Sequence, residues 1–195
     1  MRFDQIVRGR SADFLSPKAS RPIPHACGIV RDALVQATLD PEILEIDFIG
    51  TAGTEARPID IQVITFRTIA GWRYLDIEVA RPLRSLGDAD AFDRELRARG
   101  LAPYTLKGAD ILKEPRFSTA RAIWTYRRFS VAPDMRHRLL VALAEDGPTS
   151  LHHLCSSVPG PLDPFASVLS LACRNEVEID ISTPLSPSTT VSSRS

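Results

Sequence analysis

The fold is decided by the stretch RPIDIQVITFRTIAGWRYLDIEVA, which covers residues 57–80. Polar and apolar side chains alternate on both sides of Ala70-Gly71, so the stretch predicts two paired strands joined by a hairpin turn. Because strand side chains point alternately to two faces, the acidic and amide side chains of each strand share one face. These side chains are Asp60 and Gln62 on the first strand and Asp76 and Glu78 on the second.

Acidic side chains on paired strands suggest a metal site. Carboxylates that converge on one hard cation hold Mg²⁺ in phosphodiesterases, so the sequence predicts Asp60 and Glu78 as metal ligands and Gln62 as a further catalytic-site residue. Such a site normally also needs a lysine, but the chain has Ala80 there, and Arg81 is expected to face the other side of the strand. The alternative is that Asp60 and Glu78 are solvated residues at strand ends.

Composition narrows the class of protein. The chain has 195 residues, of which 24 are Lys or Arg and 24 are Asp or Glu, so any contact with nucleic acid must be local. A 44% apolar content supports a core, and no apolar run approaches membrane length.

The N-terminus lacks a basic region followed by an apolar stretch, which predicts a cytoplasmic protein. Cys27, Cys155 and Cys173 lack metal-ligand spacing, so neither disulfides nor structural zinc are expected.

The remaining elements predict an α/β domain followed by a smaller one. Helices are expected over 29–39, 88–99 and 116–129, and further strands over 43–49 and 103–106, with a Gly/Thr loop before the acidic strands. This order predicts a three-layer domain with a mixed central sheet. Helices over 135–143, from a Thr149 or Ser150 cap to Cys155, and over 164–173 precede strands at 176–181 and 189–191, as in a winged helix-turn-helix.

The expected domains follow from this order. They are a flexible basic arm (1–24), the α/β domain (25–130), the winged-helix domain (131–191) and a disordered tail (192–195). Arg121, Arg127 and Arg128 are candidate nucleic-acid contacts, although such a series also fits a solvated helix face. The helix over 164–173 adjoins a single cation, Arg174, so it is expected to dock a protein and not to read bases.

Several short motifs serve as landmarks along the chain: Arg31-Asp32, Leu39-Asp40-Pro41, Pro58-Ile59-Asp60, Glu78-Val79, Lys113-Glu114-Pro115-Arg116, Leu139-Leu140 through Gly147, and Ile179-Asp180-Ile181. In this order, they resemble the TnsA-type endonuclease subunits of heteromeric transposases over residues 25–191. The resemblance implies a restriction-endonuclease-like PD-(D/E)xK domain, a winged helix and Mg²⁺ as cofactor. It also implies partners from a mobile element: transposon-end DNA, a DDE-type transposase and an ATP-dependent regulator.

The chain departs from this family at the catalytic positions. Val30, or Ala26 in another alignment, stands where the family has a helical glutamate, and Ala80 stands where it has the motif lysine. Loss of one preorganised charge stabiliser typically lowers a rate by about 10²- to 10³-fold. The favoured hypothesis is therefore a pseudo-nuclease, catalytically impaired, that binds DNA, transposase partners or both.

Two other functions remain open at this point. One is an active Mg²⁺-dependent endonuclease that cleaves transposon ends with Asp60, Glu78 and a third group. The candidates for the third group are Asp32, Glu45 and Gln62. The other is a winged-helix DNA-binding regulator whose first domain is only a scaffold, which predicts salt-dependent, sequence-selective duplex binding.

Overall fold

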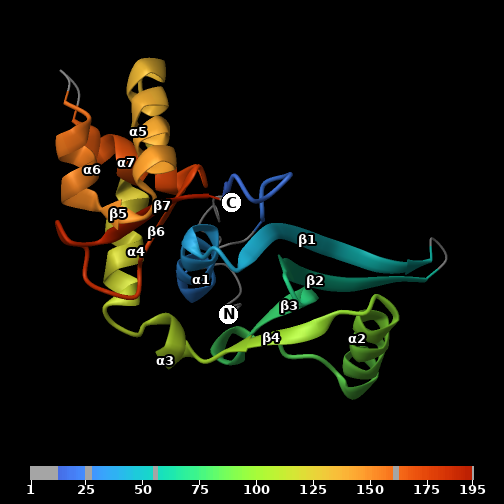
Figure 1. The fold of residues 1–195 in the computed structure, drawn as a ribbon. Helices are drawn as coiled ribbons and strands as arrows, with labels where there is room; N and C mark the ends of the chain where they lie inside the picture. Colours follow the sequence, from blue (N-terminus) through green and yellow to red (C-terminus); the bar gives the residue numbers. More distant parts are fainter. Residues whose placement is uncertain (1–12, 25–27, 55–56, 160–162, 195) are drawn as a thin grey trace, which may run out of the picture. The chain divides into compact units, whose positions relative to one another are not determined.

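The computed structural model describes residues 13–24, 28–54, 57–159 and 163–194, except the side chains of 52–54 and 57–59. Within these residues the chain forms two compact units (Figure 1). Unit 1 draws on Met1–Leu34 and Leu44–Gly108, and unit 2 on Val35–Ile43 and Ala109–Ser195. The domain limits expected from the sequence remain a prediction.

Unit 1 is built on a four-stranded sheet of order β1-β2-β3-β4. Its strands are β1 (Ile43–Thr54), β2 (Arg57–Thr68), β3 (Gly71–Ile77) and β4 (Ala102–Leu106). β2 and β3 are antiparallel, whereas β3 and β4 are parallel because the chain crosses over through helix α2 (Leu86–Ala98). The expected α/β class with a mixed sheet and flanking helices is therefore confirmed.

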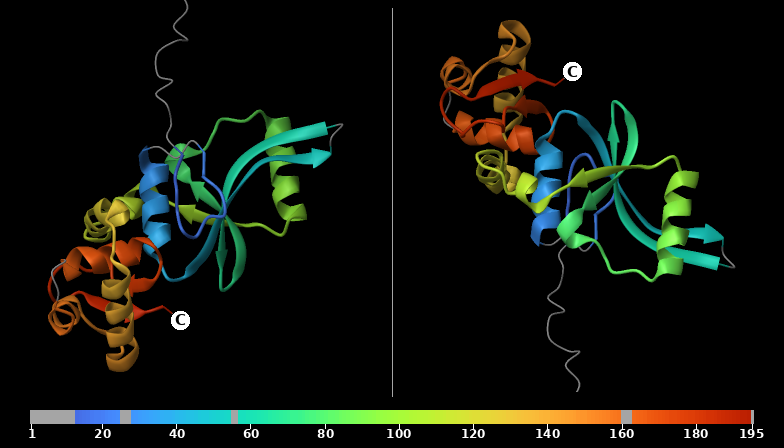
Figure 2. Two further views of the ribbon diagram at one scale, coloured as in Figure 1. Left: turned by 90° about the horizontal axis from the view of Figure 1, so that it is seen from above. Right: turned by 90° about the horizontal axis from the view of Figure 1, so that it is seen from below.

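The predicted hairpin over residues 57–80 forms, but its turn lies one residue earlier than the expected Ala70-Gly71. Thr68 pairs with Gly71, so Ile69 and Ala70 make the turn, and Gly71 takes a φ of 109°, which favours glycine. Ile61 and Val63 are buried against Leu96 of α2, whereas Asp60 and Gln62 are exposed. Figure 2 shows α2 lying against the strands of unit 1.

The predicted second acidic strand is wrong at its end. β3 stops at Ile77, and Glu78–Ala80 forms a 3₁₀ helix, η1. Glu78 therefore leaves the alternation that would have placed it beside Asp76. The predicted Gly/Thr loop is also wrong, because β1 continues to Thr54 and includes that segment.

The segment over 13–24 packs onto unit 1. Phe14 and Ile23 are fully buried and form an antiparallel bridge, and Ala19 forms a parallel bridge with Ile46 of β1. Arg31 of helix α1 (Gly28–Leu39) lies over the Phe14 ring, 5.6 Å from its centroid. This part of the expected arm is thus packed, and residues 1–12 lie outside the described residues.

Unit 2 is mostly helical. Its elements include α4 (Arg116–Trp124), 3₁₀ helix η2 (Thr125–Arg128), α5 (Pro133–Asp146), α6 (Leu151–Ser157), α7 (Pro164–Cys173), and strands β5 (Thr149–Ser150), β6 (Val177–Ile179) and β7 (Thr190–Ser193). The short α3 (Gly108–Ile111) leads into this unit. β7 pairs antiparallel with both β5 and β6. The helices predicted for this region are present, although the one expected over 116–129 is α-helical only to Trp124 and continues as the 3₁₀ helix η2.

α7 is the central helix of unit 2. Eight consecutive residues, Ala166–Cys173, are buried, and the helix packs on α4, η2, α5, α6 and β6. Burial also raises the pKa of the Cys173 thiol to about 12, so this cysteine is an inert core residue. The predicted docking role of this helix is wrong, because its apolar side chains are already covered by unit 2 itself.

Across the described ranges, no helix has the length and apolarity needed to cross a membrane.

Candidate functional site

A cavity of about 570 Å³ opens in unit 1 beside the end of β3. Its wall combines residues from α1, β2, β3, η1 and α2 with the segment between η1 and α2. The polar and aromatic side chains in the wall include Gln62, Tyr74, Asp76, Arg81, Arg84 and Phe92. Charged, amide and aromatic side chains from distant parts of the unit 1 sequence therefore lie around this cavity.

Asp76 and Arg81 form the best-defined polar contact of this cavity. Arg81 Nε lies 2.6 Å from Asp76 Oδ1, and Arg81 Nη2 lies 2.6 Å from Asp76 Oδ2. The Thr105 hydroxyl also donates to Asp76 Oδ2, at 3.1 Å. The hydrogen bonds from Arg81 hold the pKa of Asp76 below its usual value. Charge-assisted bidentate pairs of this kind fix both groups in place, so Asp76 stays ionised and paired at neutral pH.

The predicted position of Arg81 is wrong. Alternation along an extended strand would have placed it on the opposite side from Asp76. Because η1 turns the chain after Ile77, Arg81 instead folds back to Asp76, five residues earlier. Neither Asp76 nor Arg81 was predicted as a site residue, and the only sequence signal for the turn is Pro82, which restricts the residue before it.

Arg84 is held by a second set of contacts in the same wall. Its guanidinium carbon lies 3.8 Å from the centroid of the Phe92 ring, and its Nη2 donates to the Ile61 carbonyl at 3.3 Å. Tyr74 stacks edge-on against Phe92, with ring centroids 6.2 Å apart. Burial, helped by the charges of Asp76 and Asp93, raises the pKa of Tyr74, so its hydroxyl remains protonated.

Gln62 lines the cavity with an unusual backbone conformation. Its φ is 44°, in the left-handed region that residues other than glycine seldom adopt. Such strain persists only where the surrounding structure imposes it, and it concentrates at functional sites. Gln62 is the one residue of the predicted catalytic set that the wall of this cavity contains.

The two predicted metal ligands lie outside the cavity wall. Asp60 is exposed on β2, and Glu78 is exposed in η1. In contrast, Val30 and Ala80 both line the cavity. Within the described part of the chain, no group of three or more His, Cys, Asp or Glu side chains is placed to hold a metal ion.

Asp32 and Glu45, the other candidates for the third catalytic group, also lie outside the cavity wall. Glu45 forms an ion pair with Arg67, with Oε2 and Nε 3.0 Å apart. Asp32 lies on α1.

The three candidate nucleic-acid arginines lie together on α4 and η2 of unit 2. Arg121 and Arg128 are exposed. Arg127 is half-buried, donates to the Trp124 carbonyl at 3.0 Å and lies over the Trp124 ring. Arg121 and Arg128 are therefore the members of this set that a phosphate backbone could reach.

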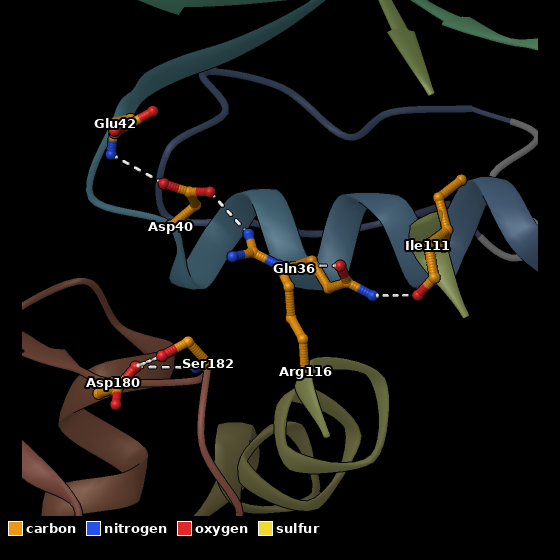
Figure 3. Close-up of polar contacts among 7 residues, drawn as sticks. All are labelled: Gln36, Asp40, Glu42, Ile111, Arg116, Asp180 and Ser182. Atoms are coloured by element: carbon orange, nitrogen blue, oxygen red, sulfur yellow. Dashed lines mark hydrogen bonds and ion pairs between the residues drawn. The ribbon is translucent and has the colours of Figure 1, made fainter. Parts of the chain in front are cut away.

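A second cluster in unit 2 surrounds Arg116 (Figure 3). Its Nη2 lies 2.6 Å from Asp40 Oδ2, and its Nε donates to Gln36 Oε1 at 3.1 Å. Gln36 is buried, and its Nε2 donates a second hydrogen bond to the Ile111 carbonyl at 2.7 Å. A cavity of about 260 Å³ beside this cluster is also lined by Asp180, whose pKa is lowered by hydrogen bonds from Ser182.

Comparison with known proteins leaves the family open, since no family model and no curated protein matches the chain.

Proposed function

We propose that this chain is a TnsA-like nuclease-fold protein with an impaired catalytic centre, which binds DNA, transposase partners or both. The observation that carries the proposal is the position of Val30, Gln62 and Ala80 in the wall of one cavity. The resemblance assigns the first and last of these to the helical glutamate and motif lysine of an endonuclease. These distant positions meet in the unit 1 cavity, which supports the assignment.

The same cavity explains why hydrolysis is expected to fail. Val30 offers no oxygen to a hard cation, and Ala80 offers no charge to a developing phosphorane. Of the two carboxylates that line the cavity, Asp76 is already paired with the Arg81 guanidinium, and Asp93 lies 4.0 Å from Arg97. We infer that this donor set does not fit a hydrated Mg²⁺ ion.

The arrangement of elements supports the finer fold assignment. A mixed sheet with α1 before it and α2 between β3 and β4 is compatible with a restriction-endonuclease-like core. In unit 2, α5, α6 and α7 precede the antiparallel pair β6 and β7, which is the element order of a winged helix. Burial of α7 argues against a winged-helix regulator that reads bases with this helix.

DNA contact is assigned to α4 and η2. The exposed Arg121 and Arg128 lie seven residues apart, the first on α4 and the second at the end of η2. Such a pair fits backbone phosphates, and phosphate contacts do not distinguish one base sequence from another. We therefore expect binding to duplex DNA without sequence preference. The DDE-type transposase and ATP-dependent regulator remain proposed partners that would direct the chain to its DNA.

Charge removal at these arginines tests the DNA assignment. The double variant Arg121→Gln/Arg128→Gln is expected to bind a labelled duplex several-fold more weakly than the unaltered chain. The slope of log K against log salt concentration should fall by about 1 for each phosphate that the variant no longer neutralises. Fluorescence anisotropy at several salt concentrations measures both quantities.

Arg136 provides the matched control, because it is an exposed arginine of unit 2 that is ion-paired with Glu176. Arg136→Gln should leave affinity and salt dependence unchanged. If the double variant bound as well as the unaltered chain, the assignment to α4 and η2 would be wrong. If the unaltered chain did not bind duplex DNA at low salt, the DNA part of the proposed function would fail.

A further inference from the structure

We propose that Arg81 and Arg84 hold a backbone phosphate of DNA in the unit 1 cavity without a metal ion. This inference rests on the proposed function and names the ligand group that the former catalytic centre would still bind. In this arrangement a guanidinium occupies the role that a metal cation would have in an active nuclease.

Arg81 is oriented for this role by Asp76. A guanidinium has five N–H donors, and two of its nitrogens, Nε and Nη2, are aligned on the Asp76 carboxylate. The Nη1 donors and the second Nη2 hydrogen remain for a ligand. The Arg81 side chain is 55% exposed and that of Asp76 is 13% exposed, so the cation is far more accessible to a ligand than its carboxylate partner.

Arg84 provides the second cation. Stacking on Phe92 and one hydrogen bond to the Ile61 carbonyl fix the plane of its guanidinium. Both contacts leave other N–H donors of Arg84 for a ligand. Because their orientation is set in advance, neither arginine loses much side-chain entropy on binding, and planar guanidinium groups suit phosphate oxygens.

The rest of the wall is consistent with a phosphodiester. Gln62 adds an exposed amide, and Val30, Ala80 and the aromatic ring of Phe92 supply apolar surface for a sugar. Asp93 also lines the wall, with its carboxylate 4.0 Å from Arg97. The cavity volume of about 570 Å³ is within the usual range of about 300–1,000 Å³ for ligand sites.

Arginine variants test the inference in buffer that contains EDTA. Arg81→Gln and Arg84→Gln are each expected to weaken duplex binding by about 3- to 10-fold and to lower the salt dependence by about 1. Addition of Mg²⁺ to the unaltered chain should not strengthen binding. Arg81→Lys should restore the salt dependence but not the full affinity, because lysine keeps the charge and loses the bidentate geometry.

The control is Arg67→Gln, which removes another half-exposed, ion-paired arginine of unit 1 that lies outside the cavity. Its affinity should match that of the unaltered chain. Equal losses of affinity in Arg67→Gln and Arg81→Gln would mean that removing any positive charge of unit 1 weakens binding. That result would overturn the inference. A requirement for Mg²⁺ in duplex binding would overturn it as well.

A direct readout separates this inference from the proposed function. The dinucleotide TpT carries a single phosphodiester, and it should shift the Nε–Hε NMR signals of Arg81 and Arg84 in the full chain. If these signals move while duplex DNA does not bind, the cavity assignment stands and the proposed DNA function fails. If they do not move while duplex DNA binds through Arg121 and Arg128, the function stands and the cavity assignment is wrong.

Discussion

Replacement of Leu169 by alanine is expected to lower the free energy of unfolding by about 2–5 kcal/mol. Leu169 is fully buried near the middle of α7, where every residue from 166 to 173 is buried. Its removal would leave a cavity beside α7, the helix that packs on α4, α5 and α6. Urea unfolding followed by circular dichroism measures the loss as a shift of the midpoint.

Leu112→Ala is the matched control for this variant. It removes the same atoms from a leucine of unit 2 that is 48% exposed, so a cost of less than about 1 kcal/mol is expected. Equal costs for the two variants would mean that α7 presents Leu169 to solvent, as a docking helix would. In that case the buried position of α7 would be contradicted.

Arg116→Ala is expected to lower the free energy of unfolding by about 1–3 kcal/mol. Stability is lost because two groups lose the donor that Arg116 provides. These are the amide oxygen of the buried Gln36 and the Asp40 carboxylate, which is 15% exposed. A buried acceptor that loses its donor keeps the full cost of its desolvation. The same urea experiment measures the change.

Two variants make the Arg116 result specific. Arg116→Lys keeps a charge near Asp40 but lacks the planar group that serves Gln36 at the same time, so an intermediate loss is expected. Arg128→Ala removes an exposed arginine at the end of η2 and should change stability by about 0.5 kcal/mol or less. A loss for Arg116→Ala no larger than that of Arg128→Ala would show that the cluster in Figure 3 contributes nothing to stability.

Local pattern was enough to predict much of the fold. The hairpin, to within one residue of its turn, the mixed sheet and the longer helices were predictable, because alternation, helical spacing and capping residues are properties of a few neighbouring residues. The buried Ile61 and exposed Gln62 follow the same rule. These features depend little on the rest of the chain.

The candidate site was less predictable, because it depends on where a strand ends. Residues 75–79 alternate as well as any strand, yet hydrogen bonding stops at Ile77 and the chain turns. That turn moves Glu78 away from Asp76 and brings Arg81 to it. The ending of a strand reflects competition among tertiary contacts, which a local pattern does not contain.

Long-range pairs and complete burial were also beyond local pattern. Arg116 and Asp40 are 76 residues apart in the sequence, and no spacing rule links them. α7 has apolar or small residues on all sides, which fits both an exposed docking helix and a central core helix. Only the packing of its neighbours decides between these two, and in unit 2 it is the core helix.

The impaired catalytic centre is tested most directly by a plasmid assay that follows binding and cleavage in one sample. Supercoiled DNA is incubated with the full chain and Mg²⁺ or Mn²⁺, at protein concentrations where a gel shift shows the DNA fully bound. We expect retarded DNA that remains supercoiled when the protein is removed. Nicked or linear product that disappears in Asp60→Ala would contradict it, because the chain would then hold a working hydrolytic centre.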